Sequence, residues 1–250
     1  MISVEQLSYS VPGRIVLRRL NLEVGKGETV GVMGLSGSGK STLLKCIAGL
    51  LIPTSGRIVV DGTEITALSE DRIIPVRRRI GLVFQYSALF DSLTVFDNVA
   101  FGLRRHRKLR AAALREAVTE KLALVGLPGV EERYPSELSG GMQKRAALAR
   151  ALALDPDILL YDEPTSGLDP VVAAVINELI VRMRNELSVT SVLVSHDIDS
   201  VFGVASRVAM LHHGRIIAEG TPEEMRACDN RIVSQFVHGR TEGPIQPGTL

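Results

Sequence analysis

A glycine-rich loop between two apolar segments constrains this chain more than any other feature. Its sequence, Gly34-Leu35-Ser36-Gly37-Ser38-Gly39-Lys40-Ser41, follows the apolar run Thr29 to Met33 and opens the segment Lys40 to Leu50, whose pattern predicts a helix. A strand–loop–helix unit of this kind lets backbone N–H groups converge on phosphate oxygens without interference from Cβ atoms. The pattern predicts an α/β fold with a phosphate site, and a plain glycine-rich turn is the alternative.

Individual residues of this loop have distinct expected roles. We expect Gly34 and Ser36 to Thr42 to contact the nucleotide, mainly through backbone N–H groups directed at the β- and γ-phosphates. Lys40 would reach the same phosphate oxygens. The Ser41 hydroxyl would bind Mg²⁺. The sequence therefore predicts binding of a nucleoside triphosphate together with a magnesium ion.

Two adjacent carboxylates follow a second apolar run. Residues Ile158 to Tyr161 precede Asp162 and Glu163, which predicts a buried strand that ends at these two acids. At the carboxyl end of a parallel strand, Asp162 would hold Mg²⁺ directly or through water. Glu163 would polarise the attacking water as a general base. An exposed acidic pair is the alternative, but exposed pairs do not usually follow so apolar a run.

A third motif is Leu138-Ser139-Gly140-Gly141-Met142-Gln143, and the segment Met142 to Leu154 that it opens has a helical pattern. Small residues and free N–H groups at a helix N-terminus make Ser139, Gly140 and Gly141 a candidate second anion site. One molecule holds one γ-phosphate in its own loop, so a second site requires a second phosphate. By itself, Ser-Gly-Gly before a helix is an ordinary helix cap.

Composition excludes several classes of protein. The chain has 250 residues with 45% hydrophobic and 23% charged residues, enough for one large domain with a sizeable core. Its formal net charge of +1 gives no electrostatic argument for nucleic acid as a partner. Two cysteines, Cys46 and Cys228, match neither a disulfide framework nor a metal site. Without a signal sequence or a long apolar run, we expect a cytoplasmic protein that reaches any membrane through a partner.

Strand and helix patterns divide the chain into regions. Between residues 86 and 155 helical patterns prevail, so we expect a helical subdomain inserted into one domain that spans residues 1–239, with residues 240–250 as a C-terminal tail. A helix is expected to begin at Thr221-Pro222-Glu223-Glu224, where a capping threonine precedes proline and glutamate. Further strands are expected at Ile2 to Tyr9, Leu20 to Val24, Ile58 to Val60, Ile80 to Phe84, Thr190 to Val194, Val208 to Leu211 and Ile216 to Glu219, and further helices at Ala111 to Val125 and Val172 to Leu187.

The three motifs, in this order and spacing, resemble those of the ATP-binding-cassette (ABC) ATPase family over nearly the whole chain. The match continues at Ala146-Ala147-Leu148-Ala149-Arg150-Ala151, and it departs from the common family pattern at Met142, where glutamine is more usual. The resemblance implies a mainly parallel sheet flanked by helices, an antiparallel β subdomain and an inserted helical subdomain. It also implies ATP hydrolysis in a head-to-tail dimer, in which Ser139 to Gly141 contact the ATP of the opposite subunit.

The resemblance also assigns roles to four single residues. Gln85 fits the glutamine that senses Mg²⁺, and His196 fits the histidine that contacts the γ-phosphate. Asp169 fits the loop that touches the opposite subunit, and Tyr9 fits the aromatic residue that stacks on adenine. From the residues alone, His196 could equally be structural, Gln85 a solvated strand end, and Tyr9 a core residue.

Two classes of ABC ATPase compete: the ATPase subunit of a membrane transporter, and a non-transport protein that acts on nucleic acid or ribosomes. The second class usually carries two cassettes or a long coiled coil, and neither is found in this sequence, so transport is favoured. The basic run Arg104 to Arg110 is either a solvated face or a contact with anionic lipid headgroups.

Three stretches look like the ATPase of the Mla-type phospholipid transporters, which serve mammalian-cell-entry (MCE) domain systems in double-membraned bacteria. These are residues 86–100, 135–142 and 235–244. The resemblance implies a peripheral location at the cytoplasmic face of the inner membrane, bound to an integral permease, with an MCE-domain lipid-binding subunit and a STAS-domain protein as further partners. Leu89, Phe90 and Phe96 would then meet the permease, or else lie in the core. An ATPase of an amino-acid or other small-solute importer is the alternative.

Overall fold

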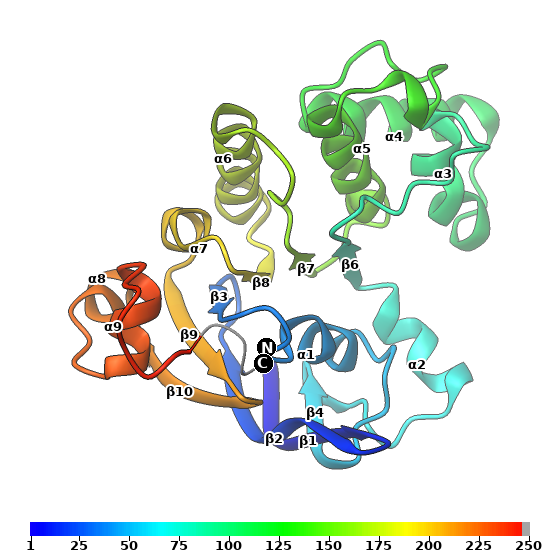
Figure 1. The fold of residues 1–250 in the computed structure, drawn as a ribbon. Coiled ribbons are helices and arrows are strands. Elements are labelled where there is room, and N and C mark those ends of the chain that lie inside the picture. The colour runs from blue at the N-terminus through cyan, green and yellow to red at the C-terminus, as the bar shows by residue number, and fades with distance from the viewer. Residues whose placement is uncertain (247–250) are drawn as a thin grey trace.

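Two β-sheets and the helices around them make up the computed structural model, which describes residues 1–246 (Figure 1). The larger sheet has six strands in the order β10-β9-β3-β8-β7-β6. All its pairings are parallel except that of β10 with β9. Its strands are β3 (Thr29–Met33), β6 (Ile80–Val83), β7 (Ile158–Asp162), β8 (Thr190–Ser195), β9 (Arg207–His212) and β10 (Arg215–Gly220).

The smaller sheet is antiparallel and has four strands in the order β2-β1-β4-β5. At its β4–β5 turn, Asp61 and Gly62 both have positive φ (49° and 78°), as a tight hairpin turn requires. The strands are β1 (Ile2–Val11), β2 (Arg14–Val24), β4 (Ser55–Val60) and β5 (Thr63–Glu64).

Helices lie on both sides of the larger sheet. Figure 1 shows α6 and α7 above the sheet, α1 below it, and α3, α4 and α5 grouped apart at the upper right. No helix among residues 1–246 is long and apolar enough to cross a membrane. The helices are α1 (Lys40–Ile47), α2 (Glu70–Arg77), α3 (Val95–His106), α4 (Ala111–Leu124), the 3₁₀ turn η1 (Pro135–Glu137), α5 (Gly140–Leu152), α6 (Pro170–Leu187), α7 (Ile198–Val204), α8 (Pro222–Arg226) and α9 (Arg231–Val237).

The central strands are buried on both faces, which divides the core into two clusters. Along β7, Leu159 and Tyr161 belong to the cluster that includes α3 to α6, whereas Ile158 and Leu160 pack with α1 and the antiparallel sheet. This alternation follows from the two-residue period of a strand. It explains why the central strands are continuous apolar runs instead of alternating ones.

The predicted fold class is confirmed, and most predicted elements are present with small shifts at their ends. The helix predicted from Lys40 to Leu50 ends at Ile47, where Ala48 caps it and Gly49 adopts a positive φ of 66°. The helix predicted from Met142 begins two residues earlier, because Gly140 and Gly141 are already helical behind the Ser139 cap, and it ends at Leu152. The boundaries predicted for the helical subdomain, the single domain and the tail stay predictions.

The helices α2, α3, α7 and α9 were not among the predicted elements. Helix α2 buries only Ile73 and contains Pro75, so it lacks the apolar periodicity that would have marked it. The predicted tail is attached to helix α9, because the side chain of Gln235 donates to the carbonyl oxygens of Arg240 and Ile245 and accepts from the Ile245 N–H group. Residues 247–250 lie outside the described residues.

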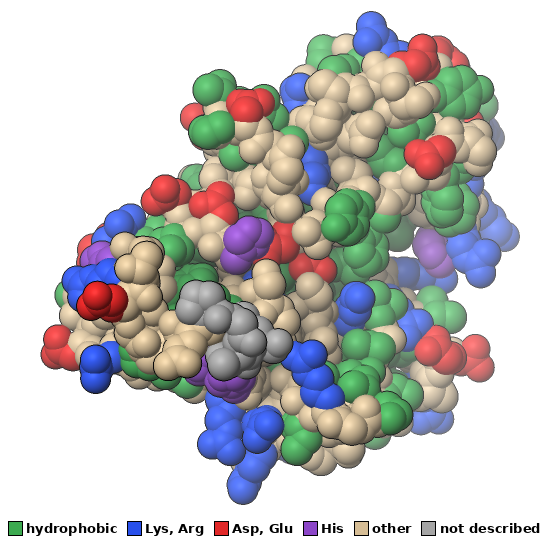
Figure 2. Space-filling model, viewed as in Figure 1, with side chains coloured by type: hydrophobic (Ala, Val, Ile, Leu, Met, Phe, Trp, Pro, Cys, Tyr) green, Lys and Arg blue, Asp and Glu red, His purple; other side chains and the backbone are tan. Residues whose placement is uncertain are grey.

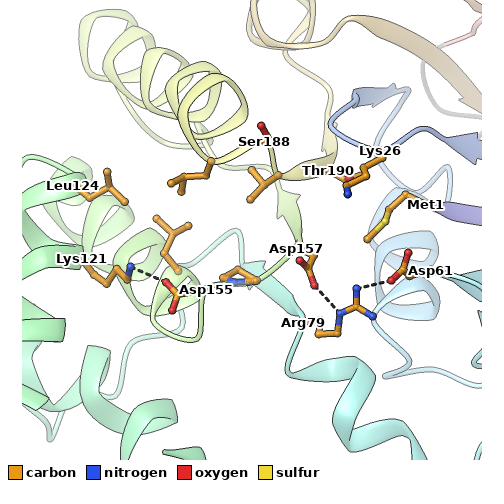
Figure 3. Close-up of a pocket in the computed structure, with 14 residues that line it drawn as sticks. Met1, Lys26, Asp61, Arg79, Lys121, Leu124, Asp155, Asp157, Ser188 and Thr190 are labelled. Carbon is orange, nitrogen blue, oxygen red and sulfur yellow. Dashed lines mark hydrogen bonds and ion pairs between the residues drawn. The ribbon is translucent and has the colours of Figure 1, made fainter. Parts of the chain in front are cut away.

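A cavity of about 420 Å³ lies at the amino-terminal ends of the parallel strands. Figure 3 shows Arg79 between Asp61 and Asp157, and Lys121 directed at Asp155. These side chains come from the antiparallel sheet, the start of β6, the start of β7 and helix α4. Because these charged groups pair with one another between neighbouring elements, we interpret this cluster as a structural connection.

We predict that Gly81→Ala destabilises the protein by about 1–3 kcal/mol through overpacking. A Cβ at Gly81 would lie 2.6 Å from Leu159 Cδ2 and 2.7 Å from the Ala151 carbonyl oxygen, between β7 and the end of α5. Gly203→Ala is the matched control, because a Cβ there meets no atom within 4 Å, and helix α7 should gain about 0.5–1 kcal/mol. Urea denaturation followed by circular dichroism measures both, and equal stabilities would contradict the prediction.

Candidate functional site

Three parallel strands end level with one another, and this alignment assembles the site. Met33 at the end of β3 pairs with Ser195, and Asp162 at the end of β7 pairs with Val194. The loops that follow these strands therefore meet at one edge of the sheet, where ligands bind in open parallel sheets. Figure 2 shows a histidine beside acidic side chains in the middle of the viewed face, between α6 and α1.

The glycine-rich loop fits tightly against neighbouring backbone. A Cβ at Gly34 would overlap the Leu211 carbonyl oxygen at the end of β9. Gly39 has a φ of 111° at the N-cap of α1, where a Cβ would lie 2.8 Å from Leu17 Cδ2. Ser38 is 5% exposed, and its Oγ has no hydrogen-bond partner among the described residues. The loop thus exposes backbone N–H groups at the start of a helix, an arrangement that suits an anion.

Lys40 is folded back across its own loop. Its Nζ donates to the carbonyl oxygens of Gly34 (2.7 Å) and Leu35 (3.1 Å) and lies 3.7 Å from Glu163 Oε1. The side chain is buried, and burial lowers the pKa of Lys40, while the charges of Glu163 and Asp162 act in the opposite direction. The Lys40 ammonium group is therefore largely shielded from water and lies against the glycine-rich loop.

Ser41 and Asp162 place two oxygen ligands side by side. The Ser41 hydroxyl donates to Asp162 Oδ1 over 2.8 Å. Burial raises the pKa of Asp162, the Ser41 hydrogen bond lowers it, and the nearby Glu163 charge raises it further. Among residues 1–246 no group of three or more His, Cys, Asp or Glu side chains could hold a metal ion alone. The Ser41 hydroxyl and the Asp162 carboxylate are hard oxygen ligands, which suits Mg²⁺, because this ion commonly completes its shell with phosphate and water oxygens.

Glu163 is held in a defined position at the end of β7. Its backbone has a φ of 49°, and its N–H donates to the Val194 carbonyl oxygen over 2.9 Å. Its Oε2 accepts from Ser195 Oγ at 2.9 Å and lies 2.9 Å from His196 Nδ1. Strained backbone at such a place is typical of functional sites. The structure brings Glu163 and His196 together as predicted residues, and it adds Ser195, which the sequence analysis did not single out.

Gln85 connects this edge to helix α5. Its Nε2 donates to Ser166 Oγ over 3.4 Å, and its backbone carbonyl oxygen accepts from Lys144 Nζ. Lys144 was missed in the sequence analysis. The sequence did indicate an unusual lysine. Gly141, Lys144 and Leu148 lie on one face of helix α5, and Lys144 is the charged member of this otherwise small and apolar set.

Ser139, Gly140, Gly141 and Asp169 form a second group. Ser139 Oγ accepts from the Met142 N–H at the start of α5, and Asp169 Oδ1 caps α6 by accepting from Val171 N–H and Val172 N–H. The two helix starts touch, since a Cβ at Gly141 would overlap Val172 Cγ1. No hydrogen bond or ion pair between described residues joins this group to Lys40, Ser41, Asp162 or Glu163.

The remaining predicted contacts lie on strand β1 and near helix α3. Tyr9 lies opposite Leu17 in the β1–β2 pairing and is partly buried against the adjacent core cluster. Leu89 and Phe96 are partly buried against the other cluster, whereas Phe90 is 44% exposed and its ring lies 5.0 Å from that of Phe101.

The basic run Arg104 to Arg110 spans the end of α3 and the loop that follows it. Within it, Arg104 pairs with Asp97, and Arg107 pairs with Asp155. Part of the run is therefore used in local ion pairs.

Sequence comparisons identify close relatives. The chain is 44% identical over 246 residues to the intermembrane phospholipid transport system ATP-binding protein MlaF of Haemophilus influenzae, covering 98% of this chain and 93% of the relative. It is 42% identical over 244 residues to the probable ribonucleotide transport ATP-binding protein mkl of Mycobacterium tuberculosis, covering 98% of this chain and 68% of the relative.

A solved structure shares the fold. The dimeric post-hydrolysis state of the ATP-binding cassette MJ0796 bound to ADP and Pi has a TM-score of 0.82 and 34% identity, covering 89% of this chain and 99% of the other. Residues 17–166, more than half of the chain, match the family described as ABC transporter. With the loop, the carboxylates and the second helix start arranged as above, the chain belongs to the ABC transporter family.

Proposed function

We propose that this protein is an ATP-hydrolysing subunit that dimerises around two ATP molecules and drives phospholipid transport between the membranes of a double-membraned bacterium. The observation that carries the ATPase part is the compact set Lys40, Ser41, Asp162 and Glu163, linked by contacts of 2.8 and 3.7 Å at one sheet edge. The phospholipid part rests on the identity to MlaF over nearly the full length of both chains.

Each candidate residue at this edge of the larger sheet has a proposed role in ATP hydrolysis. ATP enters with its phosphates on the loop from Gly34 to Thr42 and its adenine against Tyr9. Lys40 then exchanges its carbonyl partners for β- and γ-phosphate oxygens. Glu163 accepts a proton from the water whose oxygen attacks the γ-phosphorus, while the bond to the β–γ bridging oxygen breaks and ADP leaves. His196 contacts the γ-phosphate and, through Nδ1, keeps Glu163 in place.

Magnesium would be held by Ser41 and Asp162, with Gln85 beside them. When bound, Mg²⁺ neutralises charge that develops on the β- and γ-phosphate oxygens. Both donor groups are hard oxygen ligands, which suits this cation.

The second group completes the site of another copy. Ser139, Gly140 and Gly141 contact the γ-phosphate bound by the opposite subunit, and Asp169 lies at the same interface. The contact between the α5 and α6 starts supports a single surface formed by both, and the dimeric relative with ADP and Pi supports the ATP sandwich. The helical subdomain at 86–155 carries the α5 part of this surface, and Asp169 with the start of α6 follows it within the domain 1–239. Residues 240–250 form the tail.

Transport requires membrane partners. We infer a location at the cytoplasmic face of the inner membrane, where the subunit binds an integral permease through the exposed Phe90 region, with an MCE-domain lipid-binding subunit and a STAS-domain protein in the same complex. Of the three predicted apolar contacts, Phe90 is the exposed one, which supports its use in docking. A small-solute importer is the competing function, since one relative at 42% identity is named for ribonucleotide transport.

Glu163→Gln should lower the hydrolysis rate by roughly 10²- to 10⁴-fold, because the amide keeps the shape of the side chain but cannot accept the proton. The variant should bind ATP and accumulate as a dimer. Phosphate release and size-exclusion chromatography with ATP measure the two effects. Glu178→Gln on the exposed face of α6 is the matched control and should behave as wild type. A Glu163→Gln protein that stays monomeric with ATP contradicts the sandwich.

Mixing a Lys40→Ala subunit with a Ser139→Arg subunit should restore part of the activity that each lacks alone. In a heterodimer both lesions fall on one composite site and the other site is intact. Phosphate release from purified heterodimers, made with two different affinity tags, measures the recovery. Activity that stays at the level of the homodimeric variants would count against the contribution of Ser139 in trans.

The complex isolated through its membrane subunit should move fluorescent phospholipid between vesicle populations in the presence of Mg-ATP, and the Glu163→Gln complex should not. Ribonucleotide uptake by the same vesicles is the parallel assay. Transfer of phospholipid that is independent of ATP, or ATP-dependent uptake of ribonucleotide alone, would refute the proposed substrate.

A further inference from the structure

Helix α5 holds the loop after β6 with two basic side chains. Lys144 Nζ donates to the Gln85 carbonyl oxygen. Arg150 Nη2 donates to the Ser87 carbonyl oxygen over 3.0 Å, and Nη1 donates to that of Ala88 over 2.6 Å. The guanidinium carbon of Arg150 also lies 6.0 Å from the centre of the Phe90 ring. The loop from Gln85 to Phe90 is thus attached to one helix at several successive points.

Lys144 occupies an unusual environment for a lysine. It is 6% exposed, and no ion pair within the described part of the chain includes it. Burial lowers its pKa, whereas the charges of Asp162 and Glu163 oppose this effect from a longer distance. A buried ammonium group is costly unless it is well hydrogen-bonded, so its contact with Gln85 has to be close and well defined.

The loop from Gln85 to Phe90 contains strained backbone that its surroundings must hold in place. Ser87 and Ala88 have φ values of 61° and 49°, in the left-handed region that non-glycine residues rarely adopt. Such a backbone conformation is energetically unfavourable and persists only when its surroundings fix it. Hydrogen bonds from a rigid helix to the carbonyl oxygens of this segment provide that restraint.

We propose that Lys144 is a positioning residue that, together with Arg150, makes the Gln85 loop move as one body with helix α5. This inference rests on the proposed function, in which the start of α5 contacts the opposite ATP and Gln85 senses the magnesium ion. Lys144 lies three positions after Gly141 on the same helix. A displacement of the α5 start by a phosphate from the other subunit is therefore carried by a rigid helix to the Gln85 backbone, and so from one site of the dimer to the other.

Lys144→Met tests this role, because methionine retains an apolar stem but has no donor for the Gln85 carbonyl oxygen. We expect kcat to fall by roughly 10- to 100-fold, the cost of misplacing an active-site group. The dissociation constant for ADP should stay within about twofold, since the phosphate loop is untouched. Amide hydrogen exchange in residues 86–90 should become faster. Lys144→Arg, which restores a donor, should recover most of the lost kcat.

Arg145→Met is the matched control. Arg145 lies next to Lys144 on the same helix, and its Nη1 donates over 2.8 Å to the carbonyl oxygen of Gly126, away from the Gln85 loop. This variant should keep the wild-type kcat and the wild-type exchange rates at residues 86–90.

A Lys144→Met protein with wild-type kcat and wild-type exchange overturns the inference. Equal losses of kcat in Lys144→Met and Arg145→Met, or a fall in kcat matched by a lower melting temperature and not recovered by Lys144→Arg, would also overturn it in favour of a purely structural role. If the wild-type protein hydrolyses no ATP, the proposed function fails. Unchanged amide hydrogen exchange at residues 86–90 in Lys144→Met would separately contradict the positioning role.

Discussion

The parallel pairing of β7, β8 and β3 is the constraint on which the rest of the structure depends. Because Asp162 pairs with Val194 and Met33 pairs with Ser195, three loops leave the sheet at the same level. A register shift of one residue on β7 would turn Asp162 toward the opposite face of the sheet. It would also break the hydrogen bond from Glu163 N–H to the Val194 carbonyl oxygen that fixes the backbone of Glu163. The arrangement of the candidate site is thus a consequence of strand register more than of any single side-chain contact.

Much of the fold could be predicted from the sequence because the central strands are unbroken apolar runs with turn or helix signals beside them. The pairing of β9 with β10 around His213 and Gly214, and the capping box at Thr221, are examples. Helix α2 could not be predicted, since it buries only Ile73, contains Pro75 and lies mostly in solvent. Element ends also differed, because caps at Ala48 and Ser139 depend on backbone geometry that residue patterns specify only loosely.

The candidate site, like the fold, could be predicted only in part. The residues at the sheet edge could be predicted, because each belongs to a local motif whose spacing reflects one loop or one strand end. Ser195 and Lys144 could not be selected so easily, since their importance arises from contacts with residues 32 and 59 positions away. The roles proposed for Ser139 and Asp169 require a second molecule, so the geometry of one chain gives only the surface that these residues share. Long-range and intermolecular contacts are what local patterns leave undetermined.

The folded-back position of Lys40 has a consequence for nucleotide affinity. The Lys40 ammonium group has two carbonyl acceptors and a nearby carboxylate, so it is not left unsatisfied in a buried place. Binding of phosphate is therefore an exchange of acceptors, and only the difference between the two sets contributes to affinity. Loss of the proposed phosphate ligand would then return the ammonium group to acceptors within its own loop, so the charge would be compensated before and after the exchange.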